Sequence, residues 1–566
     1  MVIELAKKFI IYRTKYLTGL FDNRRVIFFI LAILTIYTLN DFIKVGFTNS
    51  DDSAGGINVL YGDYLSHASI WAKGQGRIYF YYRIPWGYIP YLIDNSLWLL
   101  FLKYSPIVGS FILISVIISK LLKSFYFGVI IYTSLLLFFS VPKDPYMLPT
   151  AYPFLFSLDL LLFLISANFY LKYLESRNYT FYGLSMLFFT IPFISYEAYF
   201  IVFVLFLLVL IKKNYENNVK SLLNKSSLKE ILPLLSIGVI FYILYFSFRK
   251  FCPSQYSGSS FSSQFSFSSF FDVIYNINKS AFPTYIYNQA QSVFVFHNST
   301  HKDNLYFLLT HTNLLNIFFS CFISIILCYN FIKISTLKIS RNKLLFILLF
   351  ALVLSFGLNA ILGLSEKYNT IENQRDGYVT TYFAFFGYTL SIVIILILIQ
   401  RIALKFKVIH FLFIFFVFII SFSTSIKIGY SNKYLSKDWN ISEKRFALVN
   451  KIIENDMFKN IPDNSVFLAN DLYETSSILG KGVCEGDFSW NNYIQLKTKR
   501  KLYFCRYIDD FKVVLDEQKN CNVYLLTKTE NLSKNIFILN VIRLNRSELS
   551  KGNYISKGKV FSAVVQ

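Results

Sequence analysis

Two adjacent acidic residues, Asp51 and Asp52, are the feature of the sequence most suggestive of chemistry. Like charges held close together raise the pKa of one carboxyl group or recruit a cation. One such carboxylate is suited to act as a general base toward a hydroxyl group. Two of them offer the oxygen ligands that a divalent cation such as Mg²⁺ or Mn²⁺ prefers. The structural alternative is an acidic cap at the start of the next helix, and residue spacing alone does not distinguish this role from a chemical one.

Basic residues follow the acidic pair in the same loop, at Lys73, Arg77 and Arg83. A guanidinium group binds phosphate through two parallel hydrogen bonds, so the two arginines are candidates to hold a phosphate group. Arg375 and Asp376 form a second polar group just before a later apolar segment. The alternative for this second group is a solvated loop whose ion pairs contribute little to stability.

Carboxylates also interrupt the apolar segments. Glu197 divides the long apolar stretch 179–211, which we interpret as two short spans joined by a turn. Its side chain either points into a catalytic cavity or is hydrated at the surface. Asp159 lies inside another apolar segment, where a carboxylate faces a cavity or a partner, and we favour a structural hydrogen-bonding role. His297 and His301 have helical spacing, but the sequence offers no third ligand for a zinc site.

The composition is that of a polytopic membrane protein. Apolar residues make up 55 % of the 566 residues, charged residues only 16 %, and the mean hydropathy is +0.47. Soluble chains are nearer to ~25 % charged. The aromatic content of 19 % excludes a disordered chain.

A membrane-spanning helix needs about 20 mostly apolar residues, and we predict eleven such spans. They are 26–46, 105–119, 124–140, 152–171, 179–194, 198–211, 231–248, 312–332, 344–362, 379–400 and 408–426. Residues 88–102 contain Asp94, and we predict that they form a helix lying on the outer leaflet. The charged segment 427–566 lacks a span and carries β-prone runs, which predicts a small α/β domain.

The distribution of basic residues predicts the orientation, because cytoplasmic loops collect Lys and Arg. With the N-terminus inside, the inner segments hold 22 Lys and Arg. The short outer loops 141–151, 195–197 and 363–378 then hold three. We therefore predict a cytoplasmic N-terminus and an extracytoplasmic C-terminal domain.

An Asp-Asp pair just after the first span, the run Gly74-Gln75-Gly76-Arg77 in the same loop, many spans and an outer tail resemble the GT-C class of membrane glycosyltransferases. The nearest resemblance is to the Gtr-type glucosyltransferases that modify O-antigen, part of lipopolysaccharide. The specific match covers about residues 26–90. The resemblance implies an all-α transmembrane module over 1–426, with a first outer loop at about 47–104, in the bacterial inner membrane.

The resemblance also implies an activity. An inverting enzyme of this class moves a sugar, here glucose or another hexose, from a polyprenyl-phosphate donor to a glycan or lipid-linked glycan acceptor. The catalytic base or metal ligand is then Asp51 or Asp52. Substrate binding is expected at Lys73, Arg77, Arg83, Glu197, Arg375 and Asp376. A divalent cation is the one cofactor suggested; the partners are membrane lipids and glycans, with no nucleic acid.

Two other functions remain open. An O-antigen or capsule polymerase also acts on lipid-linked glycans, but it would usually rely on large outer loops rich in Arg, and the loop 249–311 holds only four basic residues. A lipid-glycan flippase would carry ionisable groups at mid-membrane or internal repeats, and only Asp159 qualifies. Phosphate-binding and dinucleotide motifs are missing from the sequence, which gives no support to nucleotide-driven transport.

Overall fold

The computed structural model describes most of the helical part of the chain and the strands near its C-terminus. The described residues are 23–43, 64–83, 96–140, 147–148, 152, 154–199, 225–263, 265–282, 285, 309–310, 312–369, 377–443, 458–469, 495, 498–505, 511–512, 515–516, 520–531, 536–545 and 556–565.

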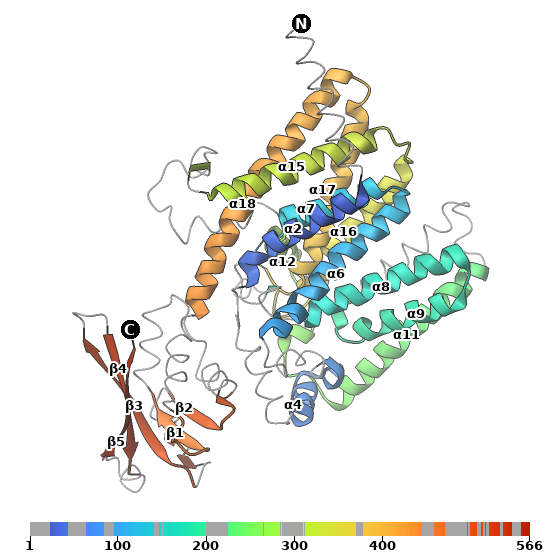
Figure 1. Ribbon diagram of the computed structural model, residues 1–566. Helices are drawn as coiled ribbons and strands as arrows, with labels where there is room; N and C mark the ends of the chain where they lie inside the picture. Colours follow the sequence, from blue (N-terminus) through green and yellow to red (C-terminus); the bar gives the residue numbers. More distant parts are fainter. Residues whose placement is uncertain are drawn as a thin grey trace.

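Seven of the described helices are long and apolar enough to cross a membrane (Figure 1). They are α2 (Arg24–Ile43), α6 (Ser96–Leu122), α8 (Leu155–Ser176), α15 (Leu314–Ser335), α16 (Arg341–Gly363), α17 (Thr381–Ala403) and α18 (Lys407–Glu443). Three further helices are α7 (Phe125–Phe138), α9 (Tyr179–Phe193) and α11 (Lys225–Phe251). This arrangement agrees with the prediction of a multi-pass membrane protein. The count of eleven stays a prediction, since 200–211 of the sixth span lies outside the described residues.

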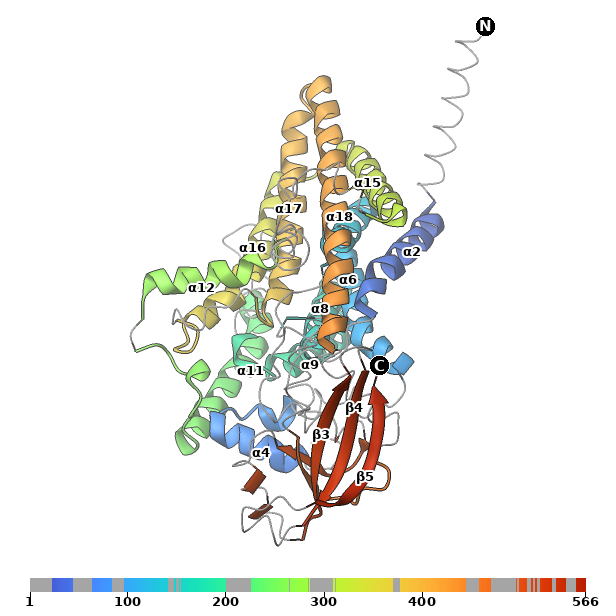
Figure 2. The ribbon, with the colours of Figure 1, turned by 90° about the vertical axis from the view of Figure 1, so that its left-hand side faces the viewer.

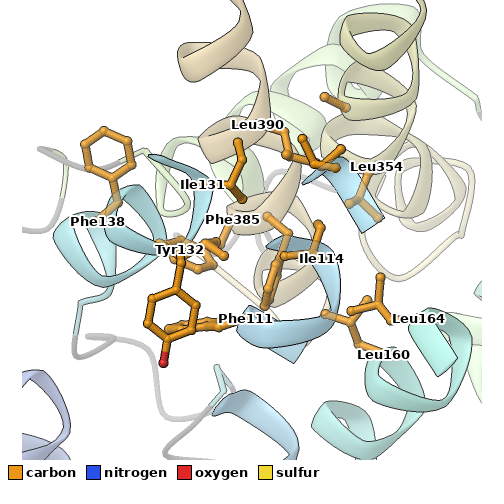
Figure 3. Packing of buried hydrophobic residues seen from close by; sticks show 14 of the residues in the cluster. Phe111, Ile114, Ile131, Tyr132, Phe138, Leu160, Leu164, Leu354, Phe385 and Leu390 are labelled. Atoms are coloured by element: carbon orange, nitrogen blue, oxygen red, sulfur yellow. The ribbon is translucent and has the colours of Figure 1, made fainter. Parts of the chain in front are cut away.

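The core lies where α6, α7, α8, α16 and α17 meet. Figure 3 shows Phe111 and Ile114 of α6 packed near Phe385 and Leu390 of α17. Twelve of the fourteen residues of α7 are buried, so this helix is enclosed by its neighbours. A side chain at Gly387 would lie within 2.6 Å of the backbone of α16, so glycine is what allows α16 and α17 to approach closely.

The turns between helices fall into two groups at opposite ends of the helical part. One end, which we call the basic end, contains the turns α6–α7, α8–α9, α15–α16 and α17–α18. Helices near these turns contact one another: Gln400 of α17 donates to the carbonyl of Phe331 of α15 (2.7 Å), and Lys120 of α6 donates to Asn168 of α8 (2.8 Å). The other end carries α4 (Tyr64–Gln75), the 3-10 turn η2 (Glu197–Tyr199) and α12 (Phe267–Lys279), and we call it the α4 end.

Two predicted boundaries are wrong. Residues 96–102 do not form a separate surface helix, because they are the first turns of α6, which tolerates Pro106 inside it. The last helix does not end at 426 but continues to Glu443, because its polar residues 427–443 keep a helical backbone beyond the apolar segment.

A five-stranded sheet lies at the same end of the molecule as α4 in both views (Figures 1 and 2). Its strands are β1 (Ser465–Leu468), β2 (Leu502–Cys505), β3 (Val523–Asn531), β4 (Ile536–Leu544) and β5 (Ser556–Val565), in the order β2-β1-β3-β4-β5. β1 pairs in parallel with β2 and β3, and the other pairs are antiparallel. One of the β-prone runs expected in this segment, 512–515, is not a strand at its two described residues, because Lys512 and Leu515 are helical.

Candidate functional site

A buried ion pair marks the candidate site at the α4 end. Nη2 of Arg77, which follows α4, lies 2.6 Å from Oε1 of Glu197, the first residue of η2. The two side chains are 9 % and 19 % exposed. Two of the residues predicted to bind substrate, 120 positions apart, are therefore in direct contact.

Gly76 sets the position of Arg77. Its φ of +62° lies in the left-handed region that favours glycine, and a Cβ there would lie 2.8 Å from the carbonyl oxygen of Cys252. The next backbone N–H, that of Arg77, donates to Ala72 and ends the helix (2.9 Å). The N–H of Gln255 donates to the carbonyl of Gly74 (3.0 Å), which fastens a second loop over this turn.

That second loop, residues 252–262, forms one wall of the site. It is held on its other side by α16, since the N–H of Glu366 donates to Ser260 (2.8 Å) and the N–H of Ser262 donates to Leu364 (3.2 Å). Arg249, at the end of α11, donates to the carbonyl of Ser259. The loop therefore joins the ends of three helices around Arg77.

Tyrosine rings enclose the guanidinium group of Arg77. Its central carbon lies 4.9 Å from the ring centre of Tyr256 and 5.9 Å from that of Tyr79. Lys367 also contacts Tyr256, with Nζ 4.8 Å from the ring centre and a hydrogen bond to the hydroxyl (3.1 Å). Cation–π contacts of this kind contribute up to ~2 kcal/mol when they are desolvated.

The electrostatics keep the arginine charged and the tyrosine neutral. Burial opposes the charge of Arg77, but Glu197 and the surrounding tyrosines more than compensate, and the pKa of Arg77 is raised well above its usual value. Burial raises the pKa of Tyr79 well above its usual value, although Arg77 acts in the opposite direction. The site thus presents a fixed cation beside a phenol that stays protonated.

Three buried polar atoms of this cluster have no hydrogen-bond partner among the described residues. They are Nε of Arg77, Oε2 of Glu197 and the hydroxyl of Tyr79. A buried polar group without a partner costs about 1–3 kcal/mol. Such groups gathered in one place are typical of a site that receives a polar ligand or ordered water.

Arg83 lies beside the same tyrosine. Its guanidinium carbon is 4.4 Å from the ring centre of Phe156, 5.4 Å from that of Tyr196 and 6.0 Å from that of Tyr79. Within the part of the chain that the structure describes, no carboxylate pairs with Arg83, and the residue is half-buried. Glu197 is the direct ion-pair partner of Arg77, and the carboxylate of Asp159 interacts electrostatically with Arg83 at longer range.

Asp159 connects the ion pair to the helices. Its Oδ2 accepts hydrogen bonds from Ser195 (2.9 Å) and from the hydroxyl of Tyr199 (2.8 Å), which flank Glu197 in the chain. The start of α8 is thereby fastened to η2. Burial, with the negative charge of Asp159, raises the pKa of Tyr82 to about 12. These bonds agree with the structural role favoured for Asp159.

Of the remaining predicted site residues, the structure describes one, Lys73. It is exposed on the last turn of α4. Four predicted site residues lie outside the described residues, namely Asp51, Asp52, Arg375 and Asp376. The same is true of His297 and His301. Among the described residues, no group of three His, Cys, Asp or Glu side chains could hold a metal ion. The cation predicted at Asp51 and Asp52 therefore stays a prediction.

Sequence reasoning missed the tyrosines that form the walls. Tyr378 follows Gly377, whose φ is +125°, and its ring centre lies 5.3 Å from that of Tyr368. Burial raises the pKa of Tyr378, while Arg77 and Arg83 oppose that shift, so the ring is within electrostatic reach of both arginines. With 42 Tyr in the chain, the sequence held no signal to single these out.

Comparisons with protein-family models, with curated proteins and with solved structures find no match. The proposed function therefore rests on the residues of the site.

Proposed function

We propose that the protein is a membrane glycosyltransferase that moves a hexose from a polyprenyl-phosphate donor to a surface glycan. The observation that carries this proposal is that two arginines, Arg77 and Arg83, lie beside the ring of the same tyrosine, Tyr79. The guanidinium carbons of Arg77 and Arg83 lie 5.9 and 6.0 Å from the ring centre of Tyr79. Glu197 forms an ion pair with Arg77, whereas Arg83 has no ion-pair partner among the described residues and interacts with the carboxylate of Asp159 at longer range. Such a site suits an anion.

A phosphate attached to a lipid is the anion that best fits this place. Guanidinium groups match phosphate oxygens in pairs, and the site lies at the ends of membrane helices, where a lipid head group would lie. Tyrosine rings present flat apolar faces to the C–H patches of a sugar and hydroxyl groups to its rim. The cluster thus offers contacts for both parts of a glycosyl phosphate.

The distribution of basic residues supports a lipid-linked donor. The basic end of the helical part carries Lys120, Lys123, Lys172, Arg177, Lys333, Lys338, Arg341, Lys343, Arg401, Lys405 and Lys407. Cytoplasmic loops collect such residues, so the α4 end faces outward in this proposal. Nucleotide sugars are cytoplasmic, and a transferase acting outside needs a donor carried by a lipid.

The proposed reaction is a single displacement. Asp51 or Asp52 takes the proton of an acceptor hydroxyl, whose oxygen attacks the anomeric carbon. The bond from that carbon to the phosphate oxygen breaks with inversion, and the electron pair leaves with the polyprenyl phosphate. Arg77 and Arg83 stabilise the charge that develops on the departing phosphate.

A flippase is less well supported than a transferase. Asp159 was the one transporter-like residue in the sequence, and its carboxylate is engaged by Ser195 and Tyr199. A mobile ion site would need a carboxylate that is available to its cargo.

The experiment is transfer of label from radiolabelled polyprenyl-phosphate glucose into surface glycan, in membranes that express the protein. We expect transfer with the wild type and its loss in Asp51→Asn/Asp52→Asn. Lys405→Ala is the control, because it removes a charge from an exposed position at the basic end, far from the proposed site. Full activity in both single variants, Asp51→Asn and Asp52→Asn, would refute the assignment of the base. Absence of transfer from every polyprenyl-phosphate hexose tested would refute the proposed activity.

A further inference from the structure

An apolar groove lies between α2, α6 and α7, away from the arginine site. Its volume is about 520 Å³, which falls in the range of ~300–1,000 Å³ usual for ligand pockets. Phe28, Ile36 and Ile112 line it and are 60 %, 70 % and 47 % exposed, so the groove opens on the outer surface of the helices. In a membrane that surface faces lipid.

Gly128 forms the floor of the groove. A Cβ at this position would lie 2.9 Å from the carbonyl oxygen of Ser115, so the absence of a side chain brings α6 and α7 close together. The close approach leaves a recess that the side chains of α2 do not fill.

The groove has the length of one membrane leaflet. Along α6 it extends from Val108 to Lys120, and twelve residues of helix rise about 18 Å. Half of the hydrocarbon core of a bilayer is about 15 Å thick. A chain from the leaflet at the basic end would therefore occupy most of the groove.

Among the residues that line the groove, the charged side chain lies at one end. Lys120 lines the groove at the basic end, where its Nζ donates to Asn168 (2.8 Å). The guanidinium carbon of Arg24 lies 5.2 Å from the ring centre of Phe125, which also lines the groove. Toward mid-membrane, the hydroxyl groups of Thr35 and Tyr132 bond to each other (2.7 Å).

We propose that the groove binds one acyl chain of an anionic phospholipid whose phosphate lies beside Lys120 and Arg24. The two cations complement the phosphate, and the apolar walls accept the chain. The occupant belongs to the leaflet at the basic end, opposite the end that holds Arg77. This lipid site is independent of the proposed transferase activity.

The test is native mass spectrometry of the full-length protein, purified in detergent and equilibrated with equal amounts of dioleoylphosphatidylglycerol and dioleoylphosphatidylcholine. We expect preferential retention of one phosphatidylglycerol. Lys120→Ala should lower this retention about fivefold, the contribution of one basic residue near an anionic head group. Lys405→Ala, exposed at the same end but outside the groove, should retain the lipid as the wild type does.

A second variant tests the groove itself without removing a polar group. Ala32→Trp adds a large side chain to the wall, and we expect it to displace the lipid. Ile419→Trp, on the exposed face of α18, is its matched control. Equal retention of the two phospholipids by the wild type would overturn the proposal. Unchanged retention in both Lys120→Ala and Ala32→Trp would overturn it as well.

Discussion

Nη2 of Arg77 lies 2.6 Å from Oε1 of Glu197, and this contact joins the end of α4 to the turn η2 across 120 residues of sequence. Both side chains are largely buried, so neither charge is compensated well by solvent. Removing one partner from such a pair leaves a buried charge alone, whereas removing both does not. The pair therefore contributes to stability as a unit.

Glu197→Leu and Arg77→Leu should each destabilise the protein. We expect a loss near the lower end of the ~3–5 kcal/mol measured for broken buried pairs, because Glu197 keeps 19 % exposure. The double variant Arg77→Leu/Glu197→Leu should recover part of that stability. Thermal unfolding in detergent measures all three. Additive losses in the double variant would show that the contact carries no coupling.

Gly76→Ala should displace Arg77 and lower both stability and transfer. A residue other than glycine in the left-handed region costs about 1–3 kcal/mol, and the new Cβ would meet the backbone of Cys252 at 2.8 Å. Gly74→Ala is the matched control, since a Cβ there meets nothing within 4 Å and alanine favours the helix. Melting temperature and label transfer are the measurements. Equal behaviour of the two variants would contradict the role given to Gly76.

The sequence predicts the helices better than it predicts the site. Apolar segments long enough to span a membrane are local features, and seven described helices are long and apolar enough to cross one. The contact of Arg77 with Glu197 depends on how distant turns pack, which no local pattern contains. The same is true of Tyr256 and Tyr378. Their side chains become part of the site only because the loops that carry them meet in the fold. The prediction for residues 96–102 failed because a local feature was misleading. Asp94 suggested a separate surface helix that ends before α6, whereas these residues are the first turns of α6.

Arg83→Ala should weaken donor binding more than it weakens the fold. Its guanidinium group contacts the rings of Phe156 and Tyr196 but forms no ion pair in the described part of the chain, so its removal breaks no direct salt bridge. We expect the KM for the lipid-linked donor to rise at least tenfold, about 1.4 kcal/mol of binding. Arg83→Lys should recover only part of this, because an ammonium group lacks the paired geometry. An unchanged KM in Arg83→Ala would remove Arg83 from the phosphate site.

Cysteines introduced at the two ends of the helical part should react with an impermeant reagent from opposite sides of the membrane. Lys250 is exposed near the α4 end, and Lys338 is exposed at the basic end. In a background with native cysteines replaced by serine, Lys250→Cys should react with an impermeant maleimide in intact cells. Lys338→Cys should react only after lysis. The reverse pattern would place Arg77 in the cytoplasm and exclude an outer-face reaction.

Asp159 allows a structural role to be separated from a chemical one. Its carboxylate accepts hydrogen bonds from Ser195 and from Tyr199, and an asparagine side chain keeps one oxygen that can accept them. Asp159→Asn should therefore retain most of the stability and transfer of the wild type.

Asp159→Leu should behave differently, because it leaves the hydroxyl of Tyr199 buried without an acceptor, at a cost of about 1–3 kcal/mol. Combining it with Tyr199→Phe removes the orphaned hydroxyl and should restore part of the loss in melting temperature. Normal stability with abolished transfer in Asp159→Asn would instead show that the carboxylate takes part in the reaction. The structural connection between α8 and η2 would then be secondary to its chemistry.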